Sequence, residues 1–187
     1  MDTKLKADIA ESAVVTRLLK EGFRILKPMG DRLPYDLGIE AGGKLLKIQI
    51  KSAWLRKGVY TVDSRRTKTN RRQMVRSRYG VDDFDFAILY IEDLDVFYVM
   101  PLKVFSSYKS GITLVEGATR QRKPRSYQYR EAWDLLKKWA AQSETIERNL
   151  SNSVNHGMGI PSQVRQAGWK GVETRRQAPE VFSRVKV

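Results

Sequence analysis

Two extended segments joined by a pair of glycines set the framework of this sequence. Segments 35–41 and 44–52 mix apolar and polar residues in an alternating pattern, and Gly42 and Gly43 stand between them. A two-residue glycine connection is typical of a tight β-hairpin, because both turn positions need backbone conformations that glycine adopts without strain. The sequence therefore predicts that the second segment folds back against the first as an antiparallel strand.

The rest of the chain carries both helix and strand signals. Helices are expected at 4–21 and 130–141, and further strands at 23–26, 58–63, 86–91 and 96–100, with a short edge strand at 112–115. The polar stretch 64–80 is expected to be a loop that leads into a short helix. This order predicts an α/β (mixed α+β) domain over residues 1–142, a mixed central sheet flanked by helices. Residues 143–187 have few large apolar side chains and no persistent periodicity, so we expect a weakly structured C-terminal extension.

Charge and composition narrow the classes of function. The 187 residues include 35 Lys plus Arg against 21 Asp plus Glu, a formal net charge of +14, which favours a polyanionic partner such as nucleic acid. The absence of cysteine excludes disulfides and thiolate chemistry, and the single histidine, His156, excludes most histidine-based metal and triad sites. No window approaches the about 18 apolar residues of a membrane span, and the charged first residues are unlike a signal peptide. We therefore expect a soluble, cytoplasmic protein without a membrane partner.

Alternation along the two hairpin strands places three polar side chains on one surface. If Ile48 and Ile50 point to the core, Gln49 and Lys51 point the other way. The hairpin then brings Asp36 next to them. Carboxylate and amide oxygens suit Mg²⁺, and a neighbouring lysine can stabilise charge on a phosphate or orient a water molecule. The spacing alone also fits a hairpin with polar residues on a solvated face.

Glu11 on the first predicted helix is a further candidate for this site. Val14, Val15 and Leu18 follow it at three, four and seven residues, so Glu11 borders an apolar face. A partly buried acid at that place is a candidate outer or second metal contact. The alternative is a solvated helix residue without a role in chemistry.

Lysine and arginine gather in two segments. Residues 56–78 hold nine cations and a single acid, Asp63. Phosphates attract such clusters largely independently of base sequence, whereas Arg, Asn or Gln side chains that reach base edges add specificity. A charge run is otherwise a solvated face, but this density of one sign favours DNA contact, and we hypothesise that segment 65–72 lies in the major groove. Tyr79 is expected to pack in the core. The candidate DNA-binding residues are Arg65, Arg66, Lys68, Asn70, Arg71, Arg72, Arg76, Arg120, Arg122, Lys123 and Arg125.

The spacing of Asp36, Gln49 and Lys51, with Glu11 on a preceding helix, resembles the PD-(D/E)XK nuclease motif, with one residue inserted between Pro34 and Asp36. The chain up to about residue 141 also resembles the homing endonucleases encoded in cyanobacterial group I introns. The stretches that carry this resemblance are DIAESAVVTRLL, LKPMGDRLPYDL, KIQIKSAW, RRTKTNRR, DFDFAILYI and RQRKPRS.

This resemblance implies a PD-(D/E)XK core and a sequence-specific endonuclease that cuts double-stranded DNA with Mg²⁺, or with Mn²⁺ in its place, and promotes intron mobility. Asp36, Gln49, the Ile50 backbone carbonyl and Glu11 would hold the metal, and Lys51 would stabilise developing charge or position the water. One site cuts one strand, so a double-strand break needs at least a dimer, and the resemblance implies a homo-tetramer. Gln49 departs from the broad superfamily, which has Asp or Glu there, although the homing endonucleases share it. The missing negative charge is expected to weaken metal binding.

Two other functions remain compatible with the sequence. A structure-selective nuclease of the Holliday-junction type would share the fold and would prefer branched DNA. A basic nucleic-acid-binding protein without chemistry would bind without metal and cut no substrate.

Overall fold

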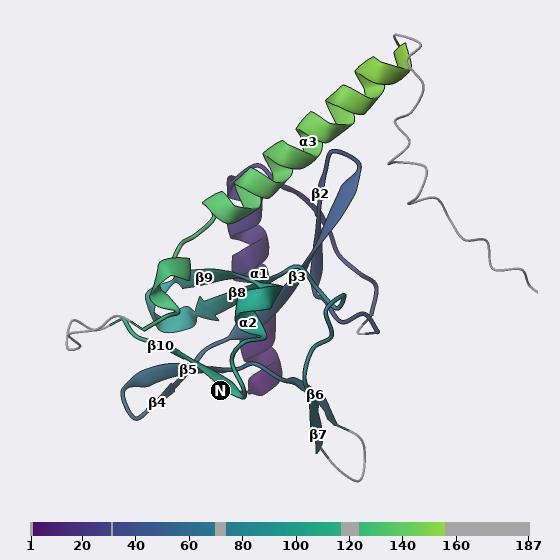
Figure 1. Ribbon diagram of the computed structural model, residues 1–187. Helices are drawn as coiled ribbons and strands as arrows, with labels where there is room; N and C mark the ends of the chain where they lie inside the picture. Colours follow the sequence, from purple (N-terminus) through teal and green to yellow (C-terminus); the bar gives the residue numbers. More distant parts are fainter. Residues whose placement is uncertain (1, 31, 70–73, 117–123, 156–187) are drawn as a thin grey trace, which may run out of the picture. The chain divides into compact units, whose positions relative to one another are not determined.

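The computed structural model describes residues 2–30, 32–69, 74–116 and 124–155 (Figure 1). Its helices are α1 (Thr3–Lys20), α2 (Leu102–Phe105) and α3 (Asp134–Asn155), with short 3₁₀ turns η1 (Glu92–Leu94) and η2 (Tyr127–Tyr129). Its strands are β1 (Arg24–Leu26), β2 (Leu37–Ala41), β3 (Lys44–Ser52), β4 (Trp54–Arg56), β5 (Val59–Asp63), β6 (Arg66–Thr69), β7 (Met74–Ser77), β8 (Phe86–Ile91), β9 (Val96–Pro101) and β10 (Gly111–Leu114).

Five strands form a central mixed sheet in the order β1-β2-β3-β8-β9. β3 and β8 run parallel, and the other neighbouring pairs are antiparallel. The predicted turn joins β2 to β3, with Gly42 and Gly43 at φ values of 57° and 66°, and it sets Leu37 opposite Ile48. The predicted fold class, a mixed α+β domain with a central mixed sheet and helices, is confirmed.

Helix α1 covers one face of this sheet. The side chain of Asp2 caps it by accepting a hydrogen bond from the Lys4 N–H at 3.1 Å, and Gly22, at φ 84°, lies just beyond its end. The side chains of α1 that are buried in the core are Ala10, Val14 and Leu18. Because burial of a valine or leucine side chain is worth about 1.5–3 kcal/mol, this stripe fixes α1 against the strands that carry the candidate site.

Strands β8 and β9 are buried on both faces. Ile88 and Val99 belong to the core under α1, whereas Leu89 and Met100 belong to a second core. Residues of β5, β10 and α2 also contribute to this second core. Strands covered on both sides are apolar throughout rather than alternating, which explains the continuous runs FAILYI and VFYVM in the sequence.

The polar stretch 64–80 differs from the prediction of a loop and short helix. It forms an antiparallel ribbon of β6 and β7, which pairs Arg66 with Ser77 and Thr67 with Arg76 and projects from the domain (Figure 1). Residues 75–78, at the end of the ribbon and just after it, are exposed. An exposed ribbon has no apolar face, so the alternation that reveals a half-buried strand is absent from its sequence. β4 was not predicted either.

Helix α3 is longer than the predicted helix at 130–141, and it starts four residues later. The domain boundary expected after residue 142 therefore falls inside a helix, and the compact unit that contains the strands ends at Asn149. Residues 156–187 lie outside the described residues, so the prediction of a weakly structured extension there stays a prediction. None of the helices in the described parts of the chain is long and apolar enough to cross a membrane.

Candidate active site

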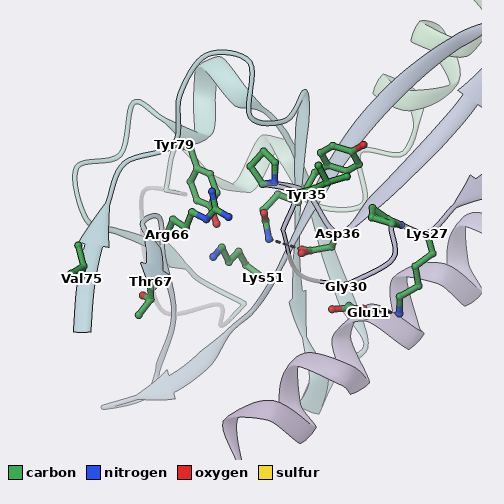
Figure 2. A pocket seen from close by; sticks show the side chains of 14 residues that line it. Glu11, Lys27, Gly30, Tyr35, Asp36, Lys51, Arg66, Thr67, Val75 and Tyr79 are labelled. Atoms are coloured by element: carbon green, nitrogen blue, oxygen red, sulfur yellow. Dashed lines mark hydrogen bonds and ion pairs between the residues drawn. The ribbon is translucent and has the colours of Figure 1, made fainter. Parts of the chain in front are cut away.

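Asp36, Gln49 and Lys51 line one cleft of about 850 Å³ at the side of the central sheet. Asp36 directly precedes β2, and its N–H donates to the Ile48 carbonyl at 2.8 Å, so the hairpin ladder fixes its backbone. Gln49 and Lys51 stand on β3, and the intervening Ile50 is buried in the core under α1. The structure thus brings together the three side chains that alternation placed on one surface, and Figure 2 shows Asp36 and Lys51 facing the same space.

The carboxylate of Asp36 is half-buried and accepts two hydrogen bonds at a single atom. Its Oδ2 accepts from the Ile50 N–H at 2.6 Å and from Gln49 Nε2 at 2.5 Å. Burial raises the pKa of Asp36 from 3.8 to about 6, because the loss of hydration outweighs these two bonds, and the charge of Glu11 adds to the rise. The surroundings of Asp36 therefore favour either the protonated carboxyl group or a carboxylate with a bound cation beside it.

The side-chain amide of Gln49 lies between two oxygens. Only 7% of the residue is exposed, and Nε2 donates to Asp36 Oδ2 and, at 3.1 Å, to the carbonyl of Ile50. A hydrogen-bond donor thus stands between a carboxylate and a carbonyl, where a positive charge would also be stabilised. Half a turn about the last side-chain bond would present the amide oxygen in place of the nitrogen.

These donors fit a divalent cation. Among the described residues, no group of three or more His, Cys, Asp or Glu side chains could hold a metal. The oxygen ligands at this cleft are instead the Asp36 carboxylate, the Ile50 carbonyl and, after half a turn of its amide, the side-chain oxygen of Gln49. Mg²⁺ takes hard oxygen ligands and is usually held by one or two carboxylates, with water and phosphate oxygens completing its shell. The residues present therefore suit Mg²⁺ or Mn²⁺ with few protein ligands.

Lys51 is held away from bulk water beside an aromatic ring. Its Nζ donates to the Arg65 carbonyl at 3.5 Å and lies 5.2 Å from the centroid of the Tyr79 ring. Tyr79 in turn makes edge contacts with Phe84, at 4.9 Å between centroids, and with Phe105, at 6.0 Å. Burial lowers the pKa of Lys51, although Asp36 partly offsets this. Tyr79 packs in the second core as predicted, and it also borders the cleft, which the sequence did not indicate.

Glu11 reaches the cleft from α1 and is held there by a lysine. Its Oε2 forms an ion pair with Nζ of Lys27 at 3.0 Å. Lys27, which follows β1, also lines the cleft, and hydrogen bonding to Glu11 raises its pKa. Nothing in the sequence singles out Lys27, because the proximity of a helix residue and a residue sixteen positions later depends on the tertiary fold.

The candidate DNA-binding residues of the ribbon have different surroundings. Arg66 lines the cleft, and Lys68 lies in β6. Arg65 donates to both carboxylate oxygens of Asp63 at 3.0 Å, so its charge is partly neutralised within the protein. Arg76 is exposed and lies 3.9 Å from the same carboxylate.

Arg125 is set in a different part of the surface. Its guanidinium stacks 4.5 Å from the centroid of the Tyr108 ring and donates to the Ser107 hydroxyl. These two contacts fix the position of an exposed cation. The other candidate DNA-binding residues lie outside the described residues, and their assignment stays a prediction: they are Asn70, Arg71, Arg72, Arg120, Arg122 and Lys123.

Comparison with known proteins defines the class to which this fold and cleft belong. A family model described as PD-(D/E)XK endonuclease matches residues 1–136, which include all four residues of the candidate site. The chain therefore belongs to the PD-(D/E)XK endonuclease family and is a nuclease.

Among solved structures, the chain is similar to that of a bacterial homing endonuclease, I-Ssp6803I. The two are 57% identical, and the match covers 77% of this chain and 99% of that chain with a TM-score of 0.70. The resemblance to PD-(D/E)XK homing endonucleases is thereby confirmed. A separate comparison with curated proteins finds no match.

Proposed function

We propose that this protein is a sequence-specific homing endonuclease that hydrolyses phosphodiester bonds in both strands of duplex DNA with Mg²⁺, for which Mn²⁺ can substitute. The observation that carries the proposal is the convergence of Asp36, Gln49 and Lys51 in one cleft that a basic ribbon borders. Membership of the endonuclease family supplies the class of reaction, and 57% identity to I-Ssp6803I supports a homing activity that promotes intron mobility.

Each residue of the cleft has a part in this proposal. Asp36, the Ile50 carbonyl and the amide oxygen of Gln49 hold the metal, with Glu11 as an outer contact. When bound, the metal supplies Lewis-acid activation of the phosphate and of a water molecule. Lys51 stabilises the negative charge that develops on the phosphate oxygens, or orients the attacking water. Because Lys51 is largely shielded from solvent, its charge acts more strongly on a nearby phosphate than it would in water.

The β6–β7 ribbon is the proposed DNA-reading element. The major groove of B-DNA is about 12 Å wide and admits a two-stranded β-ribbon. Arg66 and Arg76 lie on opposite strands of the ribbon, so phosphates or base edges on both sides are within their reach. Arg66 also lines the cleft, which connects the reading element directly to the site of cleavage.

Cleavage of both strands sets a requirement on assembly. The described chain contributes one cluster of Asp36, Gln49 and Lys51, and such a cluster acts on one phosphodiester at a time. We therefore propose a homo-oligomer on DNA, at least a dimer and in its full form a tetramer, in which two clefts face the two strands.

The proposal is tested with a plasmid library of genomic fragments from the source organism, incubated with Mg²⁺ or with EDTA. The purified protein should linearise a defined subset of plasmids at one mapped position, and only with Mg²⁺. Asp36→Ala and Asp36→Asn should abolish the cut, whereas Glu40→Ala, at a partly buried position of β2 outside the cleft, should leave it intact. Persistent cutting by either Asp36 variant contradicts the metal site. Cutting of four-way junctions but of no linear duplex contradicts the homing function, and binding without any cutting contradicts the nuclease activity.

A further inference from the structure

One cation of the cleft has no role in the chemistry described so far. Lys27 directly follows β1, whose last residue, Leu26, pairs with Gly38 of the hairpin. Its backbone is thus attached to the sheet, while 66% of its side chain is exposed and its Nζ lies 3.0 Å from Oε2 of Glu11. Glu11 itself is 29% exposed. Both residues line the same cleft as Asp36, and Figure 2 shows the pair beside Asp36.

The charges of the cleft explain why Glu11 needs a cation there. Glu11 and Asp36 lie close enough for the charge of Glu11 to raise the pKa of Asp36. Lys51, the cation on the hairpin strand, is directed to the Arg65 carbonyl and the Tyr79 ring. Lys27 therefore neutralises Glu11 in the DNA-free protein. A metal ion bound at Asp36 would supply the same neutralisation, so the metal and Lys27 compete for one carboxylate.

A DNA phosphate offers Lys27 a second anion. An exposed ion pair such as Lys27–Glu11 contributes little to stability, so its loss is small. A charge-assisted bond from an ammonium to a phosphate replaces it, and the release of condensed counterions from DNA adds to the gain. The exchange is thus favourable when DNA enters the cleft and leaves Glu11 without its cation.

We propose that Lys27 is a phosphate-binding residue that pairs with Glu11 in the absence of DNA and releases it when DNA binds, so that substrate binding makes Glu11 available to the metal. This rests on the proposed function, in which DNA and metal meet in this cleft. Lys27 acts on the metal through Glu11, so it is a positioning residue for that step. Thermodynamic linkage requires that the metal in turn strengthens DNA binding.

Two binding measurements that need no cleavage test this inference. The first is Mn²⁺ binding to the DNA-free protein by calorimetry, and the second is the salt dependence of binding to a random-sequence duplex in EDTA. Lys27→Met should tighten Mn²⁺ binding about two- to fivefold, because Glu11 no longer has a competing cation. It should also reduce the slope of log K against log salt by about 0.9 per protomer, the value of one lost phosphate contact.

Three further variants make the result specific. Lys27→Arg should behave as the wild type in both measurements, since it keeps a cation at the same place. Lys44→Met removes an exposed lysine on the hairpin outside the cleft. It should change neither the Mn²⁺ affinity nor the slope of log K against log salt. In a Glu11→Gln background, Lys27→Met should no longer change Mn²⁺ affinity but should still lower the salt slope.

The outcomes separate this inference from the proposed function. If Asp36→Asn binds Mn²⁺ as tightly as the wild type, the metal site itself is wrong and the inference is overturned with it. If Asp36→Asn loses Mn²⁺ binding while Lys27→Met leaves Mn²⁺ affinity at the wild-type value, the metal site stands and the competition between Lys27 and metal is overturned. An unchanged salt slope in Lys27→Met overturns its contact with phosphate.

Discussion

The amide nitrogen of Gln49 donates to Oδ2 of Asp36 at 2.5 Å, at the position where the superfamily motif has a second carboxylate. Two carboxylates at this distance would repel each other, and one of them would hold a proton near neutral pH. The amide instead satisfies Asp36 and, through the same nitrogen, the Ile50 carbonyl. Glutamine at this position therefore favours a stable metal-free site over strong metal binding.

Gln49→Glu should reverse this balance. In EDTA at pH 7.5 the variant should unfold at a temperature several degrees below the wild type, because a second carboxyl group beside Asp36 must either take up a proton or repel its charge. Addition of Mg²⁺ should raise its Tm by more than it raises that of the wild type. Thermal unfolding with and without Mg²⁺ measures both effects, and Gln128→Glu, at an exposed position, is the matched control. Equal Tm values for Gln49→Glu and the wild type in EDTA would show that the two side chains do not interact.

Asp36→Asn should stabilise the metal-free protein at neutral pH. Both hydrogen bonds converge on one oxygen of Asp36, so the single oxygen of asparagine can accept both without the charge. A pKa raised from 3.8 to about 6 corresponds to about 3 kcal/mol, which partial exposure reduces to about 1–2 kcal/mol.

The pH dependence of this effect has a defined sign. The folded-state pKa of Asp36 lies above the unfolded value, so its contribution is fully present below about pH 4 and is lost as the pH rises through about 6. Asp36→Asn should therefore exceed the wild type in stability at pH 7.5 and match it at pH 4. Denaturant unfolding at both pH values measures the difference, and a constant difference across this range would assign the gain to packing. Mn²⁺ binding by the wild type should weaken below about pH 6 for the same reason.

The parts of the fold that bury an apolar face were predictable from the sequence, and the exposed parts were not. The Gly42-Gly43 turn and the alternation after it placed Gln49 and Lys51 on one surface with Asp36, as the structure has them. The ribbon of β6 and β7 has no such alternation, because no core selects the residues on either face.

The remaining parts of the candidate site depend on tertiary contacts. Tyr79 was predicted to pack in the core, and it packs against the second core, but its contact with Lys51 depends on how β3 and the segment after β7 meet. The Lys27–Glu11 pair joins a helix to the residue after the edge strand β1. Periodicity reports which face of an element is buried, and it carries no signal for a contact between two different elements.

Tyr79→Leu should reduce the rate of DNA cleavage about tenfold, because it removes the ring that supports the Lys51 ammonium, a contact worth about 1–2 kcal/mol when shielded from water. Tyr79→Phe keeps the ring and should cleave within about twofold of the wild-type rate. Single-turnover cleavage at saturating DNA measures the chemical step apart from binding, and Tm values report any loss of packing on Phe84. Equal losses in the two variants would assign the effect to the hydroxyl group instead of the ring.

Arg66→Ala and Arg76→Ala should each weaken DNA binding and lower the salt slope by about 0.9, the expected value for one phosphate contact. Both side chains belong to the exposed ribbon, on strands that pair with each other. Fluorescence anisotropy over a range of KCl concentrations gives the slope. Arg24→Ala removes an exposed arginine of β1 that pairs with Glu40 outside the cleft, so it serves as the control. If the ribbon variants keep the wild-type slope, DNA binds elsewhere on the protein.

Gly42→Ala should destabilise the protein more than Gly58→Ala does. Both glycines have positive φ, 57° and 75°, so alanine at either position carries a backbone cost of about 1 kcal/mol. At Gly58 nothing lies within 4 Å of the added methyl group, whereas at Gly42 it would stand 2.5 Å from the backbone carbon of the buried Ser143 in α3. That contact forces the hairpin and α3 apart, and the expected total cost is about 2–4 kcal/mol. Urea unfolding measures the two values, and equal losses would mean that the turn and α3 do not pack together in solution.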